Sequence, residues 1–176
     1  MTASENTLAS GKFFRFWSAA NEPRAVVLIS HGLGEHSGRY EHVAAALTAD
    51  NLDVYAPDHI GHGKSPGKPA YIDRFSDLTS GVSELRDHIR RHHAGLPVIL
   101  IGHSMGGLIA IRLALGAHAD YAGLILTGPL LGLPGTPSRL QVMLLRVLSV
   151  LAPTIKATEI DASAVSRDPA VVSDYI

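Results

Sequence analysis

Ile101-Gly102-His103-Ser104-Met105-Gly106-Gly107 is the stretch of sequence that decides the fold. The short apolar run 97–101, rich in β-branched residues, leads into it and predicts a buried strand. The apolar segment 108–115 follows it and is long enough to form a helix. Strand, Gly-x-Ser-x-Gly and helix in this order predict a sharp turn that holds the Ser104 hydroxyl clear of its neighbours.

The same turn offers a place where negative charge can be held. Gly102 and Gly106 remove the Cβ atoms that would collide in so tight a bend. Ser104 should stand at the N-terminus of the following helix, where free N–H groups and the helix dipole favour a developing negative charge. A glycine-rich turn between a strand and a helix can also be purely structural. The functional interpretation is favoured because of the flanking elements and because of a second motif upstream.

That second motif is His31-Gly32-Leu33-Gly34-Glu35-His36-Ser37-Gly38-Arg39-Tyr40, and it directly follows the apolar run 25–30. A run without polar alternation is typical of a strand buried on both faces of a sheet. A glycine-rich loop after such a strand lets backbone N–H groups approach a ligand closely. The alternative is a flexible connector. We favour the ligand loop, because it should lie beside the strand that carries Ser104.

The rest of the chain alternates between strand and helix patterns, which predicts a mostly parallel α/β sheet. The first predicted elements are a hairpin over 7–17 that turns at Ser10-Gly11 and a helix with one apolar face, formed by Tyr40, Val43, Ala44 and Leu47. A strand over 52–57 and a loop over 58–67 follow, and then a helix whose core-facing stripe consists of Phe75, Leu78, Val82, Leu85 and Ile89. After the Ser104 segment we expect a buried strand over 123–129, an almost wholly apolar helix over 140–151, and a short last helix capped by Asp168.

The histidines and the composition exclude several kinds of site. The loop 58–67 lacks the glycine spacing of a P-loop, and we interpret Asp58-His59 as a brace for the loop rather than as a metal site. His92-His93 is interpreted as a solvated helix end. The absence of cysteine excludes disulfides and thiolate chemistry.

Length and charge set further bounds. With 176 residues, 46% of them hydrophobic, the chain can bury one sizeable core. A formal net charge of −1 gives no electrostatic reason to expect nucleic acid as a partner. The first six residues lack the basic and apolar regions of a signal peptide, and no run of about 20 apolar residues predicts a membrane span. We therefore expect a cytoplasmic protein.

Taken together, the motifs make the chain resemble the monoacylglycerol lipase group of the α/β-hydrolases, which is related to lysophospholipases. The resemblance extends over nearly the whole chain. It rests on the motifs over 31–40, 58–65 and 102–107, and on 160–161 and 165–169, which look like the segment after the first cap helix.

The resemblance implies roles for five residues. Ser104 would be the nucleophile, and the backbone N–H groups of Leu33 and Met105 would form the oxyanion hole. Glu35 and Arg39 match positions that help to hold the polar glycerol end of the substrate. The substrate implied is a small lipid ester, and the resemblance implies neither a cofactor nor a metal.

The resemblance also implies a division of the chain. Residues 1–132 would form the N-terminal part of an α/β-hydrolase core, a mostly parallel sheet flanked by helices and truncated before its last strands. Residues 133–176 would begin a helical cap, in which the helix 140–151 receives the acyl chain and contacts the membrane peripherally.

One departure from the family concerns the catalytic triad. The family order is Ser, then Asp, then His, and the last two lie on loops after later strands. The only histidine after Ser104 is His118, at the far end of the next helix and about 20 Å away at 1.5 Å per residue. His31 and His103 should lie nearer, but each sits in a motif with another task. We therefore expect the triad Asp and His beyond Ile176.

Two classes of function remain open. The first is a serine hydrolase that cleaves the ester of a monoacylglycerol through an acyl-enzyme, with lysophospholipase, general carboxylesterase and related serine peptidase as alternatives. The second is a non-catalytic, truncated fragment. For this chain alone we predict little or no activity.

Overall fold

The structure is a computed structural model that describes residues 3–116, 120–132, 138–151 and 167–175. Its internal contacts divide the chain into one unit over Met1–Gly135 and a second over Thr136–Ile176. The first unit holds the sheet and every residue of the predicted site. The division into a core over 1–132 and a cap over 133–176 stays a proposal.

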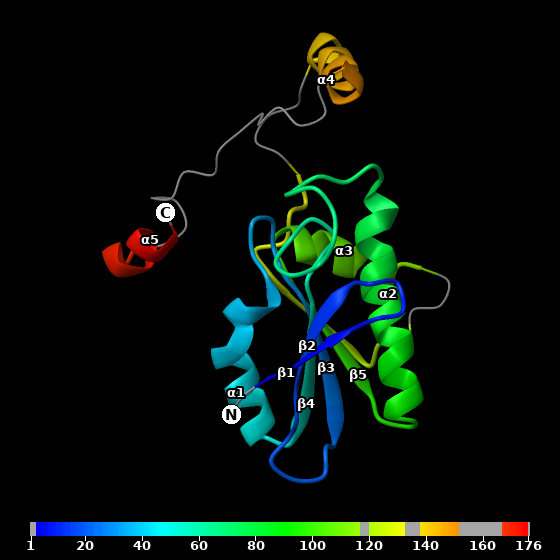
Figure 1. The fold of residues 1–176 in the computed structure, drawn as a ribbon, viewed down its shortest axis with the longest axis vertical. Helices are drawn as coiled ribbons and strands as arrows, with labels where there is room; N and C mark the ends of the chain where they lie inside the picture. Colours follow the sequence, from blue (N-terminus) through cyan, green and yellow to red (C-terminus); the bar gives the residue numbers. More distant parts are fainter. Residues whose placement is uncertain (1–2, 117–119, 133–137, 152–166, 176) are drawn as a thin grey trace. The chain divides into compact units, whose positions relative to one another are not determined.

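The first unit is built on a six-stranded sheet in the order β1-β2-β4-β3-β5-β6 (Figure 1). The predicted hairpin is confirmed, since β1 and β2 pair antiparallel and Gly11 lies in the turn between them. Strands β3 to β6 run parallel, as the alternation of strands and helices predicts. The strand bounds are β1 Ser4–Thr7, β2 Phe13–Trp17, β3 Ala25–Ser30, β4 Leu52–Pro57, β5 Val98–His103 and β6 Gly123–Thr127.

Helices cover both faces of the sheet, so the unit has three layers (Figure 1). Helix α1 (Glu41–Ala49) packs on one face through Ala44, against Trp17, Val27 and other apolar side chains of the strands. Helices α2 (Phe75–His92) and α3 (Met105–Ala114) pack on the opposite face. The predicted stripe of α2 is confirmed, since its buried residues include Leu78, Val82, Leu85 and Ile89.

The strand order itself marks a place for a ligand. From β3 the chain passes to β4 on one side, and it later returns to place β5 on the other side of β3. In open α/β sheets, ligands bind at the carboxyl ends of the strands where the order reverses in this way. The two glycine-rich motifs follow β3 and β5, and so both leave the sheet at this point.

Strand β6 differs from the buried strand that its apolar pattern predicts, and it is an edge strand, as expected for a sheet truncated before its last strands. Residues Gly123–Thr127 do form a strand paired with β5, but β6 is the last strand of the described sheet, and its burial is partial. The side chains of Leu124 and Ile125 are 40% and 49% exposed. The apolar pattern predicted cover on both faces, and the described residues do not supply it.

This edge leads to a prediction for the 176-residue chain expressed alone. We expect it to aggregate or adhere to membranes, because apolar edge strands pair with other chains. Size-exclusion chromatography of the expressed chain should give high-mass species, with nearly no esterase activity in any fraction. A soluble, cooperatively melting monomer with ordinary lipase turnover would contradict the prediction.

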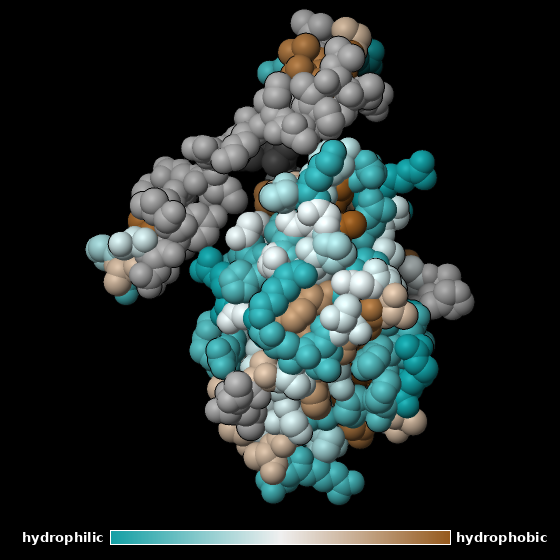
Figure 2. All heavy atoms as spheres, in the orientation of Figure 1, coloured by the Kyte–Doolittle hydropathy of each residue, from teal (hydrophilic) through white to brown (hydrophobic). Residues whose placement is uncertain are grey.

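The second unit contains helix α4 (Arg139–Leu151) and helix α5 (Pro169–Tyr175). The predicted cap of α5 is confirmed, since the Asp168 carboxylate accepts a hydrogen bond of 2.9 Å from the backbone N–H of Ala170. Helix α4 exposes several apolar side chains, among them Met143 and Leu144. Figure 2 shows hydrophobic residues in brown on the surface of this helix. None of the helices within the described residues is sufficiently long and apolar to cross a membrane.

The end of α2 corrects the interpretation of its histidine pair. His92 is exposed, as expected, but the side chain of His93 is only 14% exposed. Its Nε2 lies 2.8 Å from the Tyr55 hydroxyl, and its Nδ1 lies 3.5 Å from a carboxylate oxygen of buried Asp53. His93 therefore fastens the end of α2 to strand β4. A pair of adjacent histidines in a sequence does not reveal that one of them has partners on a distant strand.

Candidate active site

Ser104 lies between β5 and α3 in a conformation that side chains rarely adopt. Its φ is 51° and its ψ is −117°, and the predicted sharp turn is thus confirmed. The backbone N–H of Ser104 donates to the carbonyl of Thr127 at 3.0 Å, and the Ser104 carbonyl accepts from Leu130 at 3.0 Å. Such strain costs about 1–3 kcal/mol and persists only where surrounding contacts enforce it. Here β6 and the residues after it enforce the strain.

The two glycines of the motif are required by close backbone contacts. A Cβ on Gly102 would lie 2.5 Å from the Gly106 carbonyl oxygen, and a Cβ on Gly106 would lie 2.0 Å from the Ser30 carbonyl oxygen. The second contact joins the turn to the end of β3, where the other glycine-rich motif begins. The turn around Ser104 and the loop after β3 are therefore packed together through backbone atoms.

Gly32 brings the loop after β3 next to Ser104. A Cβ on Gly32 would lie 3.4 Å from the Cβ of Ser104 and 3.2 Å from a carboxylate oxygen of Glu35. That oxygen accepts hydrogen bonds from the Gly32 N–H at 3.0 Å and from the Tyr40 hydroxyl at 2.9 Å. The loop is therefore held against the turn by a carboxylate as well as by packing. This arrangement agrees with the prediction that the loop lies beside the strand of Ser104.

Glu35 is charged and belongs to a cavity next to the turn. Burial alone would raise the pKa of Glu35, but the hydrogen bonds from Gly32 and Tyr40, with the electrostatic interactions of His103 and Arg39, hold it below its usual value. The cavity has a volume of about 230 Å³. Its lining residues are Glu35, Arg39, Tyr40, His42, Val43, His103 and Thr127. Glu35 and Arg39 thus line one cavity together, with 3.9 Å between Arg39 Nε and a Glu35 oxygen.

Asp58 braces its own loop 58–67, as the sequence predicts, and it also holds the loop after β3, which the sequence does not predict. One oxygen of the Asp58 carboxylate accepts from the N–H and the hydroxyl of Ser37, at 2.7 and 2.6 Å, and the other accepts from the N–H of Lys64 at 2.8 Å. Gly63 lets this carboxylate approach, since a Cβ there would lie 2.1 Å from it. No group of three or more metal-ligating side chains lies together within the described residues.

Two buried histidines connect the same loops. His31 Nε2 accepts a hydrogen bond of 3.0 Å from the backbone N–H of His59, and His59 Nε2 lies 3.1 Å from the hydroxyl of Ser30. Both rings are almost fully buried, at 1% and 2% exposure. Burial lowers the pKa of His31 to about 4 and that of His59 well below its usual value, so both rings are neutral near pH 7.

The buried ring of His31 predicts a loss of stability in acid. Because its folded pKa of about 4 lies below its unfolded value of 6.5, the unfolded state binds the proton first as the pH falls. Between pH 6.5 and about 4, His31 alone should cost the complete polypeptide about 3 kcal/mol of unfolding free energy. Urea denaturation across this range measures it, and His31→Asn should flatten the slope. An equal slope in both proteins would contradict the prediction.

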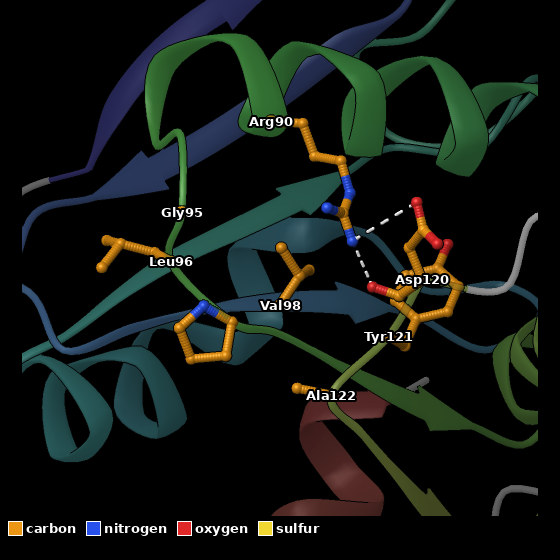
Figure 3. Close-up of a pocket in the computed structure, with 8 residues that line it drawn as sticks. Arg90, Gly95, Leu96, Val98, Asp120, Tyr121 and Ala122 are labelled. Carbon is orange, nitrogen blue, oxygen red and sulfur yellow. Dashed lines mark hydrogen bonds and ion pairs between the residues drawn. The ribbon is translucent and has the colours of Figure 1, made fainter.

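A second cavity, of about 440 Å³, lies at the start of β5 and β6, and thus at the opposite end of the strands from Ser104. Figure 3 shows the Arg90 guanidinium reaching across it to Asp120, whose carboxylate oxygen is 3.7 Å away. Residues 95–98 and 120–122 form the remaining wall. None of the predicted site residues lines this cavity, and we assign it no function.

The structure brings the predicted residues together and adds others. Ser104 and Met105 lie in the turn, while Leu33, Glu35 and Arg39 lie in the loop packed against it. Met105 is the first residue of α3, so its N–H has no acceptor within the helix. The contact of Tyr40 with Glu35 was not predicted, although Tyr40 lies only five residues further on in the same motif. The Thr127 hydroxyl lies 2.9 Å from His103 Nδ1, and no sequence pattern predicts this contact. His118 lies outside the described residues.

A mostly parallel sheet with a strained serine turn at its switch point defines an α/β-hydrolase fold. Residues 21–176 match the family model "Serine aminopeptidase, S33" (Hydrolase_4), and the chain belongs to this family.

Within the family, the chain is similar to monoglyceride lipases. It is 39% identical to human monoglyceride lipase and 40% identical to monoacylglycerol lipase from Mycolicibacterium smegmatis, over 93% and 90% of this chain. The crystal structure of monoacylglycerol lipase from Paleococcus ferrophilus matches 99% of the chain with a TM-score of 0.74 and 30% identity. These matches span 54%, 57% and 62% of the respective proteins, so the chain covers less than two thirds of the length of each.

Proposed function

We propose that the polypeptide containing this chain is a serine hydrolase that cleaves the carboxylic ester of a monoacylglycerol or a similar lipid. The observation that carries the proposal is the strained turn at Ser104, packed through Gly106 and Gly32 against a loop whose charged residues line the adjoining cavity. The similarity to monoglyceride lipases supports the lipid substrate, because two such relatives match about nine-tenths of the chain.

The proposed reaction begins at Ser104. A base takes the hydroxyl proton while Oγ attacks the ester carbonyl carbon, and the carbonyl oxygen becomes an oxyanion. The N–H groups of Leu33 and Met105 hold this oxyanion, and the start of α3 adds the favourable end of a helix dipole. Collapse of the intermediate returns the proton to the leaving alcohol and leaves an acyl-enzyme. Water then attacks the acyl-enzyme by the same steps and releases the fatty acid.

The base and its orienting acid are proposed to lie beyond Ile176. Two nearby histidines are engaged in other contacts: His31 uses Nε2 and Nδ1 for the backbone of His59 and Gly32, and His103 Nδ1 lies 2.9 Å from the Thr127 hydroxyl. The chain also covers little more than half of the length of the lipases it matches. A complete triad would then form only with the rest of the polypeptide.

The cavity beside Ser104 is proposed to receive the glycerol end of the substrate through Glu35 and Arg39. A glycerol hydroxyl can donate to the Glu35 carboxylate and accept from the Arg39 guanidinium. Glu35 has a second task, because it also holds the Gly32 N–H. The two residues should therefore respond differently to substitution. The apolar helix 140–151 is proposed to contact the acyl chain and a membrane surface.

Substituting Arg39 tests the glycerol site. In the complete polypeptide, Arg39→Ala should raise KM for a monoacylglycerol by about tenfold, the loss of roughly 1.4 kcal/mol from one charged hydrogen bond, and should change a p-nitrophenyl ester little. Glu35→Ala should impair both substrates, because it also releases Gly32. Equal losses on both substrates for Arg39→Ala would mean that the residue only braces the loop.

Labelling with a fluorophosphonate tests the proposed function as a whole. The complete polypeptide should react at Ser104 and hydrolyse a monoacylglycerol faster than a lysophospholipid, a short p-nitrophenyl ester or an aminoacyl p-nitroanilide. Preference for the anilide would favour a peptidase, and preference for the lysophospholipid would favour a lysophospholipase. If the folded polypeptide shows neither labelling nor hydrolysis, this result would support the non-catalytic alternative.

A further inference from the structure

The His31 ring is held in one tautomer by its backbone partners. Its Nε2 faces the backbone N–H of His59, which can only donate, so Nε2 must accept. The neutral ring then carries its proton on Nδ1, which lies 2.7 Å from the carbonyl oxygen of Gly32. With the ring 1% exposed, water does not compete for either nitrogen. His31 therefore donates to Gly32 in a fixed direction.

This hydrogen bond fixes a peptide plane that matters for the proposed reaction. The Gly32 carbonyl shares its peptide unit with the N–H of Leu33, and in a planar trans peptide the two groups point in opposite directions. Holding the carbonyl therefore fixes the direction of the Leu33 N–H. Glycine at position 32 would otherwise turn freely, since it has more conformational freedom than any other residue.

The preceding peptide unit is held as well, from the other side. The N–H of Gly32 donates to Glu35 at 3.0 Å, and Tyr40 donates to the same carboxylate oxygen at 2.9 Å. Gly32 is thus held through its N–H by Glu35 and through its carbonyl by His31, at the point where it approaches Ser104. Both of its neighbouring peptide units are oriented by side chains.

We infer that His31 is a positioning residue: its Nδ1–H holds the Gly32–Leu33 peptide so that the Leu33 N–H stays aimed at the oxyanion. The inference rests on the proposed function, which makes Leu33 an oxyanion donor. His31 acts through this peptide, and it neither touches the substrate nor accepts the Ser104 proton. His31 therefore keeps its proton throughout the reaction, whereas the catalytic base must take up and release a proton in every cycle.

Two substitutions in the complete polypeptide separate this role from general packing. His31→Leu and His31→Asn both remove the acceptor for the His59 N–H. The asparagine side-chain N–H can take the place of Nδ1–H and donate to Gly32, whereas leucine cannot. The two variants therefore differ in the hydrogen bond under test. His62→Phe is the control, because the His62 ring lies 5.4 Å from that of His31 and its Nδ1 faces the carbonyl of Ile60 instead.

We expect His31→Leu to lower kcat about 10²-fold at a nearly unchanged KM, because losing one oxyanion donor costs about 10²–10³ in kcat. His31→Asn should recover most of this loss, and His62→Phe should keep the parent kcat. The NMR signal of the Leu33 amide should move in His31→Leu and stay near its parent position in His31→Asn. Circular dichroism should show that every variant is folded.

Any of three results would overturn the inference. The His31→Leu variant could keep the parent kcat, or the leucine and asparagine variants could lose kcat equally. The Leu33 amide signal could also stay at its parent position in His31→Leu. An unsubstituted polypeptide that hydrolyses no ester would overturn the proposed function instead. The Leu33 amide signal would still decide in that case whether His31 orients the peptide.

Discussion

Ser104→Ala in the complete polypeptide is expected to lower kcat for ester hydrolysis by about 10⁵–10⁶-fold. The hydroxyl is the proposed nucleophile, and an alanine methyl group can form no acyl-enzyme. A residual rate of roughly 10³-fold over water should remain, because the substitution leaves the proposed oxyanion hole and substrate site in place. Steady-state kinetics on a monoacylglycerol and loss of fluorophosphonate labelling both measure the effect.

The control for Ser104 is Ser80→Ala, which removes an exposed hydroxyl on α2. It should keep the parent kcat and the label. Alanine at position 104 meets the same unfavourable φ of 51° as serine, so the unfolding free energy of Ser104→Ala should stay near that of the parent. Substantial hydrolysis by folded Ser104→Ala would show that the nucleophile lies elsewhere.

Gly106→Ala should cause the largest loss of stability, about 4 kcal/mol or more, or prevent folding altogether. The added Cβ would lie 2.0 Å from the Ser30 carbonyl oxygen and 2.5 Å from that of His31. Both are backbone atoms at the end of β3, and they cannot rotate away as a side chain can. Soluble yield and the urea midpoint of the complete polypeptide measure the loss.

Gly123→Ala is the matched control for this substitution. Its Cβ would meet only side-chain carbons of Ile99, at 3.7 and 3.8 Å, which is ordinary contact. The variant should fold like the parent protein. Equal destabilisation by the two alanines would mean that Gly106 is not required by its contact with β3.

The sequence predicted what depends on local pattern. The apolar run 25–30, the stripe of α2 and the turn at Ser104 each carry their own periodicity or glycine spacing, and each is confirmed. The partial exposure of β6 agrees with the expectation that the sheet is truncated before its last strands, and that expectation came from the family resemblance. The local pattern alone predicted a buried strand, because the same apolar residues occur whether or not another strand covers them.

The side-chain network of the site was predicted only in part. Asp58-His59 was predicted to brace loop 58–67, but the contact of Asp58 with Ser37 in the loop after β3 was not. The contacts of His31 with His59 and of Tyr55 with His93 join residues that are far apart in the chain, and no periodicity connects such partners. Polar contacts of this kind depend on where the fold brings each side chain.

The pairing of β3 with β5 has a consequence for how fast the protein folds. Ser30 lies opposite Gly102 in this parallel pair, and all of α1, β4 and α2 intervene in the chain. Closing so long a loop has an entropic cost before any contact is gained, and chains dominated by such distant contacts fold slowly. The strained turn depends on this pairing through Gly106, so it cannot form as a local hairpin does. The two halves of the proposed oxyanion hole should consequently meet late, when pairing between distant parts of the chain completes the sheet.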